Sequence, residues 1–264
     1  MLNLKQISNK IVIVSILIIS CYSCNKYEKR EILFAENLHR DFLGDSVSEK
    51  LYLFSDSIYI FTRTFKSTEN NDIEQRKGKF IILNDTIHFS RNLFKDIKSK
   101  IAIIKDNYIE IIDEDRYKIK VVRTELPDII HFDSKKFNNY ALFSYCQSID
   151  SSLFKNSKPY NLDNSELTQI DSLLVYCMSK DPQLKTKNNS NYYKQCIATI
   201  NLNKEIVVWI NCICNKSVFN IGEEFKLQIA GKVNDGGTCF FKLKMNLTKR
   251  IYFDLRINGD AWFK

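Results

Sequence analysis

The feature that most constrains how this chain folds is a series of short segments, between Glu49 and Val121, in which hydrophobic and polar residues alternate. Successive side chains of a β-strand point to opposite faces, so alternation with period two is typical of a strand with one buried face. Polar breaks such as Leu83-Asn84-Asp85 and Lys105-Asp106-Asn107 separate the segments. We therefore predict about five to seven strands that pair in order as an antiparallel meander, forming a small barrel or a sandwich.

The C-terminal part has a different pattern, which predicts one helix followed by a sheet. Asp163 is a favourable N-cap, and Glu166 three residues later completes a capping box. A hydrophobic stripe at helical spacing follows, made of Leu167, Ile170, Leu174, Cys177 and Met178. The strand-like runs after it are 193–200, 206–213, 225–233, 239–247 and 251–257. We expect the helix to cover one face of an antiparallel sheet and the other face to be wet.

Two details of that sheet can be predicted from local sequence. Asn234-Asp235-Gly236-Gly237 is a strong hairpin signal between two of the runs. Alternation in the last run places Ile251, Phe253 and Leu255 together on the buried face.

The expected fold class is α+β, mostly antiparallel β, with a meander barrel or sandwich followed by a roll of one helix on a sheet. The boundaries we predict are a signal peptide at 1–20, a tether at 21–48, a β-meander domain at 49–126, a junction at 127–160 and the helix-and-sheet domain at 161–264. Within the tether, residues 32–38 are expected to form a short turn of helix.

The N-terminus has the pattern of a secretory signal. Lys5 and Lys10 precede an apolar core, Ile11–Ile19, which is too short for a comfortable membrane span. Because Ser20 and Cys21 follow that core, the segment resembles a bacterial lipoprotein signal peptide of the Bacteroidota type. The resemblance implies cleavage before Cys21 and acylation of that residue, with Cys24 as the alternative; a plain secretory signal or an uncleaved anchor is the competing interpretation.

The lipoprotein resemblance also implies a location. Several acyl chains anchor a protein stably where one would be marginal, so we expect attachment to a membrane in the cell envelope. Surface lipoproteins of Bacteroidota carry an acidic run after the lipidated cysteine, and here Lys26, Lys29 and Arg30 dilute Glu28. We therefore expect the outer membrane and its periplasmic side.

Charge gives no sign of a nucleic-acid partner. The formal net charge is +8, and cleavage of residues 1–20 would remove only two of the lysines. Acidic and basic residues alternate throughout, as in Glu28-Lys29-Arg30-Glu31, which is typical of solvated faces rather than of a basic footprint.

The chain has eight cysteines, and an exported protein favours disulfides over metal sites. Cys212 and Cys214 would lie on one face of a strand. We predict at least one disulfide that joins Cys212 or Cys214 to Cys177, Cys196 or Cys239. A zinc site on these thiols is disfavoured because no Cys-x-x-Cys knuckle is present, and no metal or other cofactor is expected.

Two further resemblances cover parts of the chain. The Gly78-Lys79-Phe80 strand leading to Asn84-Asp85-Thr86-Ile87 resembles lipocalin-like β domains of Bacteroidota lipoproteins. The helix and sheet resemble cystatin-like or NTF2-like α+β rolls, and the segments 209–214 and 235–241 resemble uncharacterised Bacteroidota secreted proteins. None of these resemblances implies an activity.

No motif of a known enzyme class stands out. The histidines, His39, His88 and His131, have no partner at a useful spacing, and pairing of His131 with Cys146 is a remote hypothesis. Most aromatic residues are expected to fill cores, although a cleft between helix and sheet could hold an apolar ligand or a partner's loop. Trp209 and Trp262 are the possible binding anchors.

We therefore expect a non-enzymatic, membrane-anchored exported lipoprotein that binds an unknown protein or a small apolar ligand. The alternatives are an enzyme with a scattered site in the C-terminal roll and an immunity lipoprotein that neutralises a toxin. Bacteroidota also O-glycosylate Asp-Ser/Thr-aliphatic triplets. Possible acceptors are Ser46, which should be the best exposed, Ser57 and Thr86, whereas Ser172 in the predicted helix is the least suitable.

Overall fold

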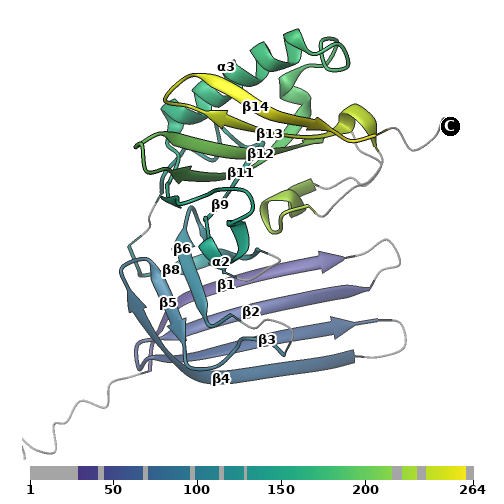
Figure 1. The fold of residues 1–264 in the computed structure, drawn as a ribbon. Helices are drawn as coiled ribbons and strands as arrows, with labels where there is room; N and C mark the ends of the chain where they lie inside the picture. Colours follow the sequence, from purple (N-terminus) through teal and green to yellow (C-terminus); the bar gives the residue numbers. More distant parts are fainter. Residues whose placement is uncertain are drawn as a thin grey trace, which may run out of the picture.

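The fold was analysed in a computed structural model, which describes residues 29–40, 45–67, 71–95, 99–112, 116–127, 130–215, 222–230 and 236–259. The predicted signal peptide, the lipidation at Cys21 or Cys24 and the anchor Trp262 lie outside these residues. The described part is α+β and mostly antiparallel, with a barrel in the N-terminal half and a helix on a sheet in the C-terminal half (Figure 1). None of the described helices is long and apolar enough to cross a membrane.

Eight strands in sequence order close into a barrel. Each strand pairs with the next, and the last returns to the first, with Leu33 opposite Thr124. The predicted meander is therefore a barrel and not a sandwich. The strands are β1 (Glu31–Arg40), β2 (Ser46–Phe54), β3 (Ile58–Lys66), β4 (Asn71–Leu83), β5 (Thr86–Phe89), β6 (Ile101–Lys105), β7 (Tyr108–Ile111) and β8 (Tyr117–Thr124).

Strand β1 corrects a sequence-based prediction, because a turn of helix was expected at 32–38. Leu33 and Ala35 point into the barrel core. The next inward position is Asn37, whose side-chain amide donates to the Tyr117 hydroxyl (2.9 Å) and to the Lys118 carbonyl (2.6 Å). The small Ala35 and the polar Asn37 at inward positions hide the alternation of hydrophobic and polar residues. The barrel therefore begins with β1, well before the expected boundary at residue 49.

The barrel interior is packed with side chains. Phe61 and Phe94 meet edge to face with ring centroids 4.1 Å apart, so the segment after β5 helps to fill the core. Two hairpin turns fall where the sequence predicts them: Asn84 has φ 58°, and Asp106 and Asn107 have φ 52° and 65°. Asn and Asp tolerate this left-handed conformation better than most residues.

The C-terminal half contains a six-stranded sheet in which β10 (Lys158–Pro159), β11 (Tyr192–Ile200), β12 (Ile206–Cys214), β13 (Phe240–Asn246) and β14 (Ile251–Ile257) are neighbours in that order. The sixth strand, β9 (Tyr140–Phe143), pairs in parallel with β11. Its residues lie in the segment predicted to be a junction, where a fully buried run of only four residues gives little signal.

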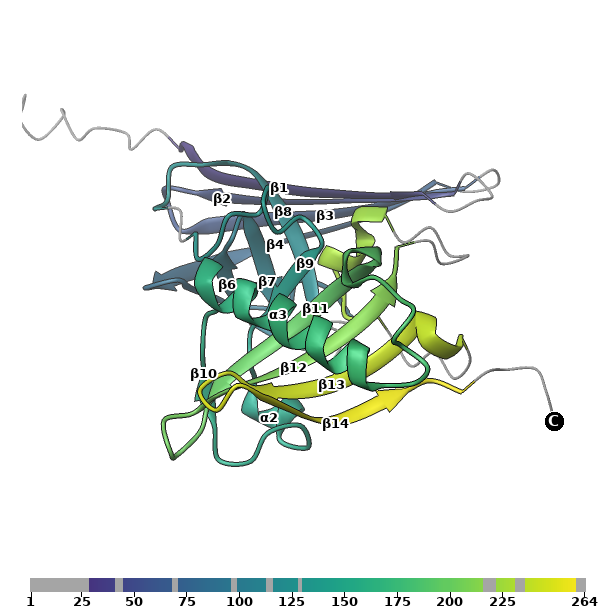
Figure 2. The same cartoon turned by 90° about the horizontal axis from the view of Figure 1, so that it is seen from above.

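Helix α3 (Asn164–Lys180) lies over this sheet (Figure 2). The predicted capping box is confirmed, because Asp163 accepts from the Glu166 backbone and the Glu166 side chain accepts from the Asp163 backbone. The predicted stripe is also confirmed: the buried residues of the helix are Leu167, Ile170, Leu174, Cys177 and Met178.

The strand predicted at 225–233 is wrong over 225–230, and residues 231–233 lie outside the described part of the chain. Residues 222–226 form a short 3-10 helix, η2 (Gly222–Lys226), followed by a turn. The buried Gln195 amide donates to the carbonyls of Phe225 and Gln228, both at 2.7 Å, and its oxygen accepts from the Ala230 backbone (2.9 Å). A side chain therefore satisfies backbone groups that a strand ladder would otherwise pair.

The predicted buried face of β14 is wrong for Ile251 and Phe253 and correct for Leu255. Ile251 and Phe253 are 49% and 41% exposed, whereas Tyr252, Leu255 and Ile257 pack toward the helix-side core. Asp254 has φ 55°, and the pairing with β13 shifts register near it. This bulge reverses the alternation. The odd-numbered residues before Asp254 are exposed, whereas those after it, Leu255 and Ile257, pack toward the core.

The second face of the sheet is not wet where it meets the barrel. A separate hydrophobic cluster covers it, built from Ala141, Phe143, Tyr145, Phe154, Ile197, Trp209 and Phe225. The short helix α2 (Gln147–Asp150) and η2 supply the covering segments, so the expected solvated face is wrong for β9, β11 and β12.

Candidate functional site

A cleft of about 160 Å³ lies where the barrel meets the C-terminal sheet. The barrel contributes the turn between β6 and β7 and the outward residues of β8, namely Asp106, Asn107, Tyr108, Lys118 and Lys120. The other wall comes from β9, η2 and the segment before β9, and it is formed by Phe132, Ser134, Tyr140, Ala141, Leu142, Glu223 and Lys226.

A buried set of charges next to the cleft joins the two walls. Glu110 of β7 is fully buried, and its carboxylate accepts from the Ser144 backbone and from the Ser144 hydroxyl, both at 2.8 Å. The Lys118 amine donates to the Leu142 carbonyl. Arg116 forms a buried ion pair with Asp150 of α2. Barrel side chains therefore satisfy polar groups of the sheet half at the point where the two halves meet.

The electrostatics of this set follow from burial and proximity. Burial alone would raise the pKa of Glu110, but the charges of Lys118 and Lys105 and the hydrogen bonds from Ser144 outweigh it and hold that pKa below its ordinary value. Burial lowers the pKa of Lys118 to about 8, although the Glu110 carboxylate opposes the shift. At neutral pH both groups are charged, and each supports the charge of the other.

A second contact fixes the turn at the end of the cleft. Asp106 accepts through Oδ1 from the His131 backbone (2.8 Å) and lies 3.2 Å from Nδ1 of the same residue. The Cys146 thiol instead lies 3.1 Å from the Ser148 hydroxyl. The structure thus gives His131 an acidic partner and does not support the hypothesis of a His131–Cys146 pair.

Within the described part of the chain, the Lys120 amine and the Tyr108 hydroxyl of the cleft have no hydrogen-bond or ion-pair partner. The Lys120 side chain is exposed, and within the described part of the chain its amine has no ion-pair partner. Burial, together with the nearby charge of Glu223, raises the pKa of Tyr108 to about 12, so its hydroxyl stays protonated at neutral pH. Lys226 is paired with Glu223 at 2.8 Å.

Trp209 is not an exposed anchor, which corrects the sequence-based prediction. Its side chain is only 8% exposed and belongs to the hydrophobic cluster that also contains Ala141 and Phe225, on the sheet face opposite Cys212. Because Ala141 also lines the cleft, the indole belongs to a cluster that reaches the cleft wall. Its fluorescence should report on changes there.

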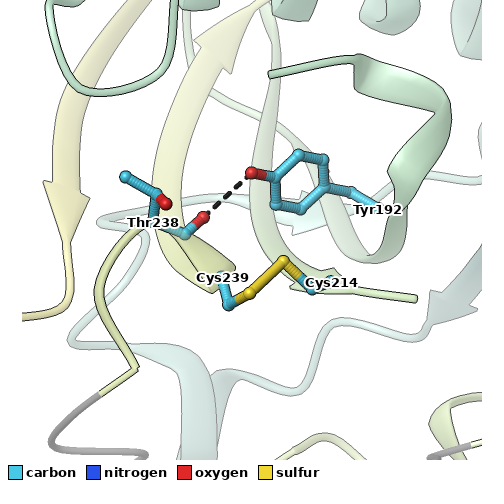
Figure 3. Close-up of a disulfide and its surroundings, with 4 residues drawn as sticks. All are labelled: Tyr192, Cys214, Thr238 and Cys239. Atoms are coloured by element: carbon cyan, nitrogen blue, oxygen red, sulfur yellow. Dashed lines mark hydrogen bonds between the residues drawn. A yellow bond between two sulfur atoms is a disulfide. The ribbon is translucent and has the colours of Figure 1, made fainter. Parts of the chain in front are cut away.

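The predicted disulfide is confirmed as Cys214–Cys239, with Cα atoms 4.8 Å apart (Figure 3). It links Cys214, at the end of β12, to Cys239, the residue before β13, close to the hydrogen bond from the Tyr192 hydroxyl to the Thr238 carbonyl (2.9 Å). Cys177, Cys196 and Cys212 are free and buried. Among the described residues, no cluster of His, Cys, Asp and Glu could hold a metal ion.

The possible glycan acceptors differ in exposure. Ser57 lies in the turn between β2 and β3 and is exposed, whereas Ser46 and Thr86 are half-buried in strands. Ser172 is exposed on α3, but its hydroxyl donates to the Thr168 carbonyl at 3.0 Å. Exposure therefore favours Ser57 over Ser46.

Sequence reasoning missed the residues at the joint. Glu110 and Lys118 are outward positions of barrel strands, and only the covering sheet half buries them. A charged residue beside Ile109 or Ile119 is also what a solvated barrel strand would show, so no local signal identifies them. No family model, curated protein or solved structure matches this chain.

Proposed function

We propose that this chain is an exported, lipid-anchored protein that binds a small amphipathic anion in the cleft between barrel and sheet. The observation that carries the proposal is the cleft itself, in which the Lys120 cation, without a partner among the described residues, and the protonated Tyr108 hydroxyl lie beside apolar side chains. The N-terminal sequence pattern supports export and lipidation at Cys21, or at Cys24. The disulfide Cys214–Cys239 fits an oxidising compartment such as the periplasm.

The chemistry of the ligand follows from which groups are free. Lys118 and Lys226 already have acceptors, whereas Lys120 and the Tyr108 hydroxyl have no partner among the described residues and can both donate hydrogen bonds to a ligand. Phe132 and Leu142 offer apolar contact on the opposite wall. A carboxylate on an apolar or aromatic body satisfies both features, because its charge lies at the mouth and its body against the wall.

Binding can be tested with the full chain solubilised in detergent, using phenylacetate as the probe and the neutral phenylacetamide as its matched control. A Trp262→Phe background leaves Trp209, whose cluster includes the cleft residue Ala141, as the fluorescent reporter. We expect phenylacetate to quench or enhance the Trp209 fluorescence in a saturable way. The amide should bind at least tenfold more weakly, because the lost charge contact is worth about 1.5–3 kcal/mol.

Two lysine variants make the test specific to the cleft. Lys120→Ala should weaken phenylacetate binding about tenfold or more, whereas Lys185→Ala, which removes an exposed lysine from the turn after α3, should leave it unchanged. Equal affinities for acid and amide, or equal effects of the two variants, would rule out anion binding in this cleft.

Anchoring needs a separate experiment. Cys21→Ala should move the protein from the membrane to the soluble envelope fraction, and Cys24→Ala should not. If Cys24→Ala alone releases the protein, the lipid is on Cys24; if the double variant still fractionates with membranes, the lipoprotein proposal fails.

One observation favours an enzyme as the second candidate. Lys118 has a pKa of about 8 and lines the cleft, as a lysine that attacks carbonyl groups would. Its amine, however, donates to the Leu142 carbonyl and lies in the field of Glu110, which suits a structural charge better. Borohydride trapping of an aldehyde on Lys118, absent in Lys118→Met, would favour the enzyme.

A further inference from the structure

Strand β4 is only half covered by neighbouring strands. Residues Asn71 to Lys79 pair with β3, whereas pairing with β5 begins at Phe80. Figure 1 shows β4 at the lower border of the sheet that β1 to β4 form. Over residues 71–77, therefore, the side of β4 that faces away from β3 has no neighbouring strand among the described residues.

The backbone groups of this open edge can be assigned from the ladder. The Phe80 N–H donates to the Ser57 carbonyl at 2.9 Å, so Phe80 and every second residue before it turn their backbone groups toward β3. Lys79 points the other way, since its N–H donates to the Ser90 hydroxyl (2.9 Å) and its carbonyl accepts from the Ser90 backbone (2.8 Å). Ile73, Gln75 and Lys77 share the orientation of Lys79, and their backbone groups face the open edge.

The side chains of this strand are exposed and their charges are segregated. Ile73 is 65% exposed, and Gln75 and Lys77 are exposed too. Charges on an edge strand usually block pairing with another strand. Here the acidic residues come first, at 72 and 74, and the basic residues follow, at 76, 77 and 79. Such a strand repels a parallel copy of itself and attracts an antiparallel one.

We propose that β4 pairs with β4 of a second copy of this chain, antiparallel and about a two-fold axis that passes beside Gln75. In this register Ile73 faces Lys77 of the second copy, whose aliphatic stem covers the isoleucine. The outward groups of Ile73, Gln75 and Lys77 then form about six inter-chain hydrogen bonds, the pattern of a continuous antiparallel sheet.

Charge complementarity selects the second copy as the occupant. Glu74 faces Arg76 of the other chain, and the two-fold axis repeats the contact. These side chains already form a pair within one chain (2.9 Å), and just under one-third of each remains exposed to solvent, at 29% and 31% of their accessible area. In the dimer each carboxylate therefore lies between two guanidinium groups, and each guanidinium lies between two carboxylates.

The test is the mass of the full chain in detergent, measured by sedimentation, with two variants at one position. Gln75→Pro removes an N–H that faces the open edge and leaves the ladder with β3 intact. It deletes two of the inter-chain hydrogen bonds, so dimerisation should weaken about 5- to 150-fold. Gln75→Ala keeps the N–H and should remain a dimer, like the unaltered chain.

Folding and register are checked independently. The far-ultraviolet spectrum and melting temperature of Gln75→Pro should match those of Gln75→Ala. Gln75→Cys should cross-link two copies on oxidation, whereas Thr62→Cys should not, because Thr62 lies opposite Gln75 on β3 and the two copies of it would be about 14 Å apart. A monomeric unaltered chain, a Gln75→Pro chain that dimerises as tightly as Gln75→Ala, or a cross-link from residue 75 to a different polypeptide would overturn the proposal.

Discussion

Replacing Glu110 with glutamine tests whether the buried charges hold barrel and sheet together. The amide keeps the size of the side chain and can still accept from Ser144, but it leaves the charges of Lys118 and Lys105 without their buried counter-charge. Removing one partner of a buried pair typically costs about 3–5 kcal/mol. For a chain of this size that corresponds to a fall in melting temperature of about 6–20 °C.

The assay is thermal and urea unfolding followed by circular dichroism at pH 7, with Glu36→Gln as the matched control. Glu36 pairs with Lys50 at 3.2 Å on the barrel surface, where such a pair is worth less than about 1 kcal/mol. The pKa of Glu110 lies below its ordinary value of 4.5. The stability that its charge contributes is therefore fully present above about pH 4.5 and declines as the pH falls below that value. A cost below 1 kcal/mol, equal to that of the control, would refute the role given to Glu110.

Three other perturbations have predicted outcomes. Between pH 8 and 10.5 the unfolded chain retains a proton that folded Lys118 has released, so the free energy of unfolding should rise relative to Lys118→Met, by on the order of 3 kcal/mol in urea titrations. Cys214→Ser should lower stability by about 3 kcal/mol, measured without reductant, because it opens a closed loop in the unfolded chain. Asp163→Ala should cost about 1 kcal/mol by loss of the capping box, and Asp163→Asn, which keeps an acceptor, should cost less in the same assay.

Local sequence patterns were sufficient to predict the features that depend only on consecutive residues of one helix or turn. The stripe and cap of α3 are properties of consecutive residues, and so are the turns at Asn84 and Asp106. The group of cysteines that supplies the disulfide could also be predicted, since Cys214 ends β12 and Cys239 comes directly before its neighbouring strand β13. The sequence could not show which two cysteines of the group pair, because that depends on the register of the strands.

The failures come from contacts between distant segments. Gln195 holds residues 225–230 away from a strand conformation, and a bulge at Asp254 reverses the faces of β14. The cleft needs both halves of the chain, so its walls carry no pattern within either half. Glu110 is charged and outward-facing on its strand, and only the sheet half makes it a buried residue.

The most direct test of an exported, lipid-anchored protein is the intact mass of the chain purified from its own cell envelope, after alkylation in denaturant without reductant. We predict a chain that begins at Cys21, carries acyl groups there, and leaves Cys214 and Cys239 unalkylated while Cys177, Cys196 and Cys212 react. A mass that retains residues 1–20, or one that lacks acyl groups, would contradict the account.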